Sequence, residues 1–182
     1  MTTYIALLRG INVSGHNAIR MPELQDSFSA LGFDAVQTYL QSGNVIFRAD
    51  KSDEVKLASV IAARVKHDFG SVVPVLVISA KDLDQVINSN PLWPKAGGDE
   101  KLFHSTFLAE PVSAASFKAL KLPAAESERA VLVGRAVLLH CPHGYGNTKL
   151  NNNYFERALG VAATTRNWRT VLALQKLCSE SY

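Results

Sequence analysis

The chain has 182 residues, of which 47% are apolar and 19% charged, and its formal net charge is +3. This composition is typical of a globular protein, and a charge this small does not by itself indicate a nucleic-acid binder. The only two cysteines, Cys141 and Cys178, favour reduced thiols in a cytosol over a disulfide scaffold. The sequence shows no signal-peptide pattern and no apolar run near the roughly 20 residues of a membrane span. We therefore expect a cytoplasmic protein that is not embedded in a membrane.

The positive charge is concentrated near the C-terminus. Residues 135–182 contain six basic and two acidic side chains, whereas residues 1–134 contain 13 basic and 14 acidic ones. If the protein has a negatively charged partner, its binding site is expected in this last quarter of the chain.

The first half of the chain alternates β-like and helical patterns. A buried strand is predicted at 4–8, a turn-rich loop at 10–17, and a helix from Pro22 to the stop at Gly32. Two β-rich runs at 36–41 and 45–48 flank Ser42-Gly43-Asn44 and predict a hairpin. The next helix is expected to have Ser52 as its N-cap, a buried stripe and a stop at Gly70; the stripe is Val55, Ala58, Ile61, Val65 and Phe69. A strand at 73–78 and a short helix at 81–88 complete this half.

The second half repeats this order of elements. We expect strands at 102–109, 130–133, 136–140 and 161–165, and helices at 111–120, 150–159 and 167–178. The sequence therefore predicts an α+β fold of two consecutive ferredoxin-like βαββαβ-type subdomains, each with an antiparallel sheet and helices on one face. Their expected bounds are 1–95 and 96–182, and the duplication is inferred from element order alone.

Four motif blocks lie along nearly the whole chain. They are 7–13 (LLRGINV), 38–45 (TYLQSGNV), 144–150 (GYGNTKL) and 163–171 (ATTRNWRTV). In this order they resemble the domain of unknown function 1697 family. Ser14 stands where that family commonly has Gly and Thr148 where it usually has Ser, and neither change removes a hydroxyl or a charge. The resemblance implies a bacterial-type cytoplasmic α+β protein, and it implies no activity, substrate or cofactor.

The loop Gly144-Tyr145-Gly146-Asn147-Thr148-Lys149 is the strongest candidate site. It lies between a predicted strand and a predicted helix, so glycine-permitted backbone N–H groups, a helix N-terminus and Lys149 could together hold an anion. It has neither Walker A nor Rossmann spacing. The alternative is an ordinary turn with Thr148 or Asn147 as a helix N-cap.

Two further segments offer groups that bind phosphate or carboxylate. The run 164–169 is expected to open the last helix, where Thr165, Arg166 and Asn167 would surround its N-terminus. The alternative is an Asn167 or Thr165 cap, with Trp168 in the core. Arg9 follows a buried strand, so its charge must reach a ligand, an acidic partner or water.

Other patterns favour structural interpretations. We interpret the Ser42-Gly43-Asn44 segment as an ordinary hairpin, and we expect it at the opposite end of the sheet from Arg9. The run His140-Cys141-Pro142-His143 is not expected to bind a metal, because adjacent strand residues point to opposite faces. His16 and His67 are expected at the surface. His104 is expected within a strand, where side chains alternate between the two faces, and no other role is predicted for it. No paired carboxylates lie near a candidate loop.

The favoured function is binding of a phosphate-bearing small molecule or nucleotide in the C-terminal half, without a cofactor or metal. The anion-binding residues would be Gly144, Tyr145, Gly146, Asn147, Thr148, Lys149, Thr165, Arg166, Asn167 and Arg9. The alternatives are a transferase or hydrolase acting on a phosphate ester or acyl group, a nucleic-acid-binding module, and an interaction module that pairs through sheet edges. Nucleic-acid binding is not favoured, because the central strands lack an aromatic run for base stacking. The oligomeric state is left open.

Overall fold

Two four-stranded antiparallel sheets organise the protein, which is described over residues 1–180 from a computed structural model. The chain divides into two compact units. Unit 1 comprises Met1–Lys81 together with the chain from Leu174 onward, and unit 2 comprises Asp82–Ala173. The expected subdomain bounds of 1–95 and 96–182 stay a prediction.

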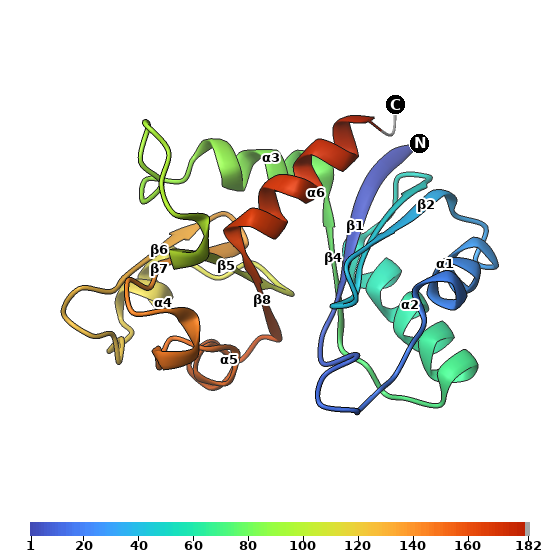
Figure 1. The fold of residues 1–182 in the computed structure, drawn as a ribbon, viewed down its shortest axis with the longest axis horizontal. Helices are drawn as coiled ribbons and strands as arrows, with labels where there is room; N and C mark the ends of the chain where they lie inside the picture. The colour runs from blue at the N-terminus through green and yellow to red at the C-terminus, as the bar shows by residue number, and fades with distance from the viewer. Residues whose placement is uncertain (181–182) are drawn as a thin grey trace. The chain divides into compact units, whose positions relative to one another are not determined.

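Unit 1 has the element order βαββαβ. Its elements are β1 (Thr2–Leu8), α1 (Met21–Ser29), β2 (Asp34–Tyr39), β3 (Asn44–Ala49), α2 (Glu54–Phe69) and β4 (Val75–Ser79). The sheet order is β2-β3-β1-β4, and α1 and α2 lie together on one side of it (Figure 1). Stacked and edge-on contacts among Phe28, Phe33 and Phe47 fill the space between the helices and this sheet.

The N-cap of α2 lies one residue later than predicted. Asp53, not Ser52, is the N-cap, and its side chain accepts a hydrogen bond from the Lys56 backbone N–H. The helix buries Leu57, Ile61 and Val65, while Val55 is 51% exposed. Including Val55 in the buried stripe was therefore wrong, because it lies two residues from Leu57 and so on the far side of the helix.

Unit 2 repeats the same order of strands and helices. It contains α3 (Ala80–Asn88, which begins at the boundary), η1 (Glu100–Leu102), β5 (Phe103–Leu108), α4 (Ala114–Lys118), β6 (Arg129–Val133), β7 (Ala136–His140), η2 (Tyr145–Asn147), α5 (Asn152–Leu159), β8 (Ala163–Asn167) and the first part of α6 (Trp168–Glu180). The sheet order is β6-β7-β5-β8, and α4 and α5 lie on one side of it (Figure 1). The fold is therefore α+β, with two similar subdomains.

The two sheets match strand for strand, down to equivalent hydrogen bonds. The Leu8 N–H donates to the Gly43 carbonyl at 2.8 Å, and the Leu108 N–H donates to the Arg135 carbonyl at 2.8 Å. In each sheet this bond joins the end of the first strand to the hairpin between the second and third. The predicted repeat of element order thus extends to topology and register.

The expected separation of Arg9 from the Ser42 hairpin was wrong. β1 and β2 are each antiparallel to β3, so they run in the same direction and finish at the same end of the sheet. The helix α1 carries the chain back between them, as in a βαβ unit split by an inserted strand. The first two motif blocks consequently meet at one end of unit 1.

None of the helices within residues 1–180 is long and apolar enough to cross a membrane.

Candidate functional site

The loop Gly144–Lys149 follows β7 in unit 2. Gly144 has a φ of 85°, a conformation that favours glycine, and Tyr145–Asn147 form a single 3-10 turn. The chain then becomes extended, with Thr148 buried and Lys149 exposed. The lysine side chain therefore points outward while the residue before it anchors the loop.

The helix N-terminus expected beside Lys149 lies farther along the chain. α5 begins at Asn152, and its N-cap is Asn151, whose side-chain oxygen accepts from the Tyr154 N–H at 3.0 Å. Neither predicted cap serves the helix: the Thr148 hydroxyl accepts from the Leu150 N–H, and the Asn147 amide donates to the His143 carbonyl. The sequence prediction that Thr148 or Asn147 caps α5 was wrong, because Asn151 lies closer to the first helical turn and is an equally good cap.

The hydroxyl of Thr165 ties this loop to the sheet and to α5. Its Oγ1 lies 3.1 Å from Tyr145 Oη, 2.8 Å from Thr106 Oγ1 and 2.7 Å from Asn152 Oδ1. The amide oxygen of Asn152 can only accept, so Thr165 must donate its single proton there. Tyr145 and Thr106 therefore both donate to Thr165, and the proton directions of the whole cluster are fixed.

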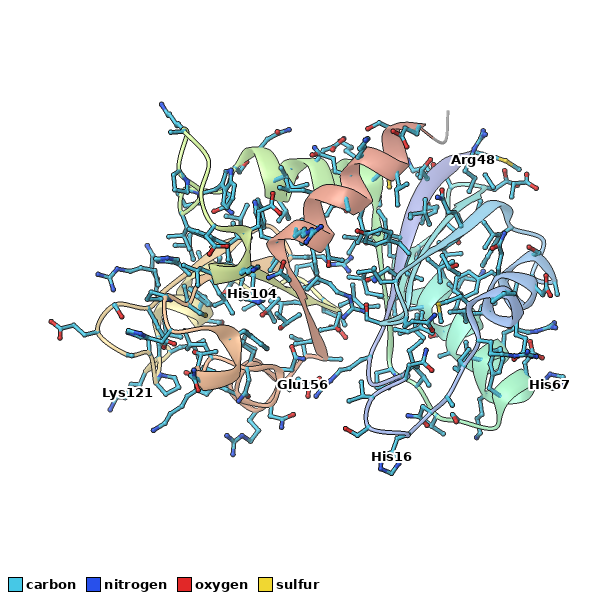
Figure 2. The ribbon with its side chains drawn as sticks, viewed as in Figure 1. His16, Arg48, His67, His104, Lys121 and Glu156 are labelled. Atoms are coloured by element: carbon cyan, nitrogen blue, oxygen red, sulfur yellow. The ribbon has the colours of Figure 1, made fainter. Side chains whose placement is uncertain are left out.

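His104 lies beneath the same loop, near the start of β5 (Figure 2). Its ring stacks on the Tyr145 ring with a centroid distance of 4.6 Å, and the residue is only 7% exposed. Burial lowers the pKa of His104 to about 4, so the imidazole is neutral at physiological pH. Its Nδ1 is buried and has no hydrogen-bond partner among residues 1–180.

Arg166 lies on the opposite face of the sheet from this cluster. It follows Thr165 in β8, and successive strand residues point to opposite faces. Its guanidinium donates to Thr164 Oγ1 at 3.0 Å and to the Thr165 carbonyl at 3.1 Å. Burial lowers the pKa of Arg166 to about 10, which leaves it cationic at neutral pH. The structure therefore brings Tyr145 and Thr165 together but places Arg166 behind the sheet.

The remaining predicted residues have structural contacts. Asn167 accepts a hydrogen bond from the Arg169 N–H at the start of α6, and Trp168 is 1% exposed, so the cap and core interpretations describe this segment. Residues 163–167 form β8, and the helix predicted to open within 164–169 begins at Trp168. Arg9 belongs to unit 1, where its backbone N–H donates to the Pro74 carbonyl at 3.0 Å.

The first two motif blocks form a tightly bonded corner of unit 1. The Asn12 side chain donates to the carbonyls of Ile19 and Gln41 and accepts from the Ile19 N–H, at 2.8 to 2.9 Å. Gly43 packs so closely that a Cβ there would lie 2.7 Å from Ile11 Cδ1 and 2.8 Å from Leu8 Cβ. This packing gives the blocks a structural role.

The Cys141 thiol is protonated at neutral pH and so is not a ready nucleophile. Burial, together with the negative charge of Glu128, raises the pKa of Cys141 to about 11. His140 stacks on Phe103, and His16 and His67 are exposed. Among residues 1–180, no three His, Cys, Asp or Glu side chains are grouped so as to hold a metal ion.

Sequence reasoning missed three members of the cluster: His104, Thr106 and Asn152. A signal for the first two was present, because residues 104 and 106 of a predicted strand must share a face. Asn152 lies in the Asn151–Asn153 run, where only coordinates distinguish the cap from its neighbours.

Comparison with known proteins identifies the family. Residues 1–138 match the family described as "Protein of unknown function (DUF1697)". The chain belongs to this family. The matched region contains the first two motif blocks, whereas the loop at 144–150 and the block at 163–171 lie beyond it.

A solved structure shares the fold over the full length. The conserved bacterial protein SP0830 from Streptococcus pneumoniae aligns with a TM-score of 0.77 at 23% identity, covering 98% of this chain and 99% of its own. At this identity the similarity establishes the architecture of both subdomains. No curated protein is similar enough in sequence to match the chain.

Proposed function

We propose that unit 2 binds a phosphate-bearing small molecule at the loop Gly144–Lys149. The observation that carries the proposal is a set of unused donors on one exposed loop. Among residues 1–180, the backbone N–H groups of Gly146 and Lys149 have no acceptor, and both residues are exposed. Two amide donors and the Lys149 ammonium match the several oxygens and the negative charge of a phosphate.

The anchoring of the loop supports this proposal. The Tyr145–Thr165 hydrogen bond and the buried Thr148 hold the segment in one conformation before any ligand arrives. A loop that is already ordered loses less conformational entropy on binding, so a modest number of contacts can give a measurable affinity.

The residues that we expect to contact the ligand are fewer than those predicted from the sequence. Gly144–Lys149 would contact the ligand, and Thr165 and Asn167 would support the loop and the adjoining strand. Arg166 is outside the contact set because it lies on the other face of the sheet. Arg9 is also outside the proposed contact set, because it belongs to unit 1 and the loop Gly144–Lys149 to unit 2.

A charge reversal tests the proposal. Titration calorimetry with sugar phosphates and nucleotides should detect saturable binding to the wild type, and Lys149→Glu should weaken it about 10-fold or more, because an attractive charge becomes repulsive. The matched control is Lys121→Glu, which changes the same charge at another exposed lysine of unit 2 (Figure 2). Equal effects of the two variants would refute a specific role for the loop.

We also propose that this binding takes place in the cytoplasm. Both cysteines are free and buried, in agreement with a reducing compartment. Fractionation of the native host with an antibody against the protein tests the location, and recovery outside the cytoplasm would contradict it.

A further inference from the structure

The strand β6 forms an edge of the unit 2 sheet. The sheet order β6-β7-β5-β8 places β7 on one side of it and no strand on the other. Its residues, Arg129–Val133, read RAVLV, and none of them is buried. An edge strand presents backbone N–H and C=O groups that its own sheet does not use, and these groups can pair with a further strand.

Hydrogen bonds next to β7 show which way its backbone groups point. The Leu108 N–H donates to the Arg135 carbonyl, and the Cys141 N–H donates to the Leu102 carbonyl. Residues 135 and 141 flank β7, and alternate residues of a central antiparallel strand bond to opposite neighbours. The odd-numbered residues of β7 therefore bond to β5, and its even-numbered residues bond to β6.

The same alternation fixes the direction of the backbone groups of β6. The even-numbered residues of β7 lie opposite Arg129, Val131 and Val133, so these three residues use their N–H and C=O groups within the sheet. The N–H and C=O groups of Ala130 and Leu132 consequently point outward from the edge. None of the remaining groups in residues 1–180 hydrogen-bonds to them.

The other three edge strands differ from β6. Most residues of β4 and β8 are buried. β2 is partly exposed, but its register shifts between Asp34 and Gln37, and Ala35 has a φ of 47°. A bulge of this kind bends a strand and disfavours pairing at an edge. β6 keeps a continuous register along its whole length, so it is an exposed and regular edge.

We propose that β6 pairs in antiparallel orientation with β6 of a second copy of this chain, which joins two unit 2 sheets into one. With a twofold axis at Val131, Ala130 lies opposite Leu132 of the partner subunit. Each of these two residues then exchanges both its N–H and its C=O with the other, so the outward groups are satisfied. Val131 lies opposite Val131 of the partner subunit.

The side chains of β6 favour its own copy in this orientation. Alanine, valine and leucine meet one another, and such apolar cross-strand pairs stabilise a sheet. Arg129 is the one charged residue of β6, and its guanidinium donates to the carbonyls of Glu126 and Glu128. Antiparallel pairing separates the two Arg129 residues by about 13 Å along the strand. Parallel pairing would place these like charges side by side, which is destabilising.

Sedimentation equilibrium from micromolar to millimolar protein tests the pairing. A contact made by one strand edge is small, and interfaces below about 1,200 Å² are typical of weak, reversible association. The mass of the wild type should therefore rise with concentration from 19.8 kDa toward twice that value. A wild type that stays monomeric at millimolar concentration would overturn the proposal.

A proline at each exposed edge identifies the surface. Ala130→Pro removes an outward N–H and no bond to β7, so it should fold and stay monomeric. The matched control is Thr38→Pro in β2. Thr38 lies opposite Val45, which bonds to β1, so its N–H also faces outward. This control should dimerise like the wild type. Dimerisation of Ala130→Pro at the wild-type concentration would overturn the proposal.

Two charged variants test the pairing without a proline. Val131→Lys and Val131→Glu each place like charges opposite one another at the twofold axis, so each variant alone should dimerise about 10-fold or more weakly. An equal mixture should recover dimers, because lysine then lies opposite glutamate. A mixture that stays as monomeric as its components would overturn the proposal. The phosphate site has no part in this test, so its outcome is independent of the proposed function.

Discussion

A methyl group at Gly43 should destabilise unit 1 far more than one at Gly10. Both glycines have positive φ, 82° and 74°, so alanine at either suffers the left-handed backbone penalty of about 1–2 kcal/mol. A Cβ at Gly10 would meet nothing within 4 Å, whereas at Gly43 it would overlap Ile11 and Leu8 at 2.7 and 2.8 Å. The Leu8 atom is a Cβ fixed to strand β1 and cannot rotate away, which adds about 1–3 kcal/mol of overpacking.

We therefore expect Gly43→Ala to lower the free energy of unfolding by about 2–5 kcal/mol and Gly10→Ala by about 1–2 kcal/mol. Urea denaturation followed by far-ultraviolet circular dichroism measures both, since the two tryptophans, Trp93 and Trp168, belong to unit 2 and both substitutions lie in unit 1. Equal losses in the two variants would refute the claim that close packing, rather than backbone conformation, makes Gly43 necessary.

Two other substitutions test local electrostatics and the hydrogen-bond cluster. Asp68 accepts hydrogen bonds from Ser27, His67 and Arg64, and these bonds lower its pKa. The ionised carboxylate therefore stabilises the fold at pH values above the usual carboxyl pKa of about 4, and this contribution is lost as the pH falls below that value. Urea midpoints of the wild type and Asp68→Asn should thus converge on acidification; a gap that stays constant from neutral to acidic pH would contradict this. Thr165→Val removes the oxygen that accepts from two hydroxyls and should lower the free energy of unfolding by about 2–4 kcal/mol. Urea denaturation followed by tryptophan fluorescence measures this loss. A loss below about 0.5 kcal/mol would show that the cluster contributes little to stability.

The order of elements was predictable because its signals are local. Pro22 lies in the first turn of α1, which ends at Ser29, three residues before the predicted stop at Gly32. The buried positions of Leu24 and Phe28 follow from helical spacing alone. The hairpin turn at Gly43 was read from residues that tolerate positive φ. Each of these depends on interactions within a few residues.

The candidate site was only partly predictable, because its geometry depends on partners that are distant in the sequence. The loop Gly144–Lys149 and Thr165 were identified separately, but their hydrogen bond requires β8 to lie beside β5. Arg166 was grouped with them by sequence proximity, and the strand that β8 forms turns its side chain to the opposite face. The sequence predicted a strand at 161–165, and its extension to Asn167 depends on pairing with β5, a tertiary contact that local propensity does not encode.

Backbone amide spectra recorded during a titration with adenosine monophosphate test most directly whether the 144–149 loop holds a phosphate. The N–H resonances of Gly146 and Lys149 should shift saturably and in parallel, and in Lys149→Glu the shift of Gly146 should need about 10-fold or more ligand. Resonances in this loop that stay fixed at millimolar ligand, or saturable shifts confined to other segments, would contradict the account.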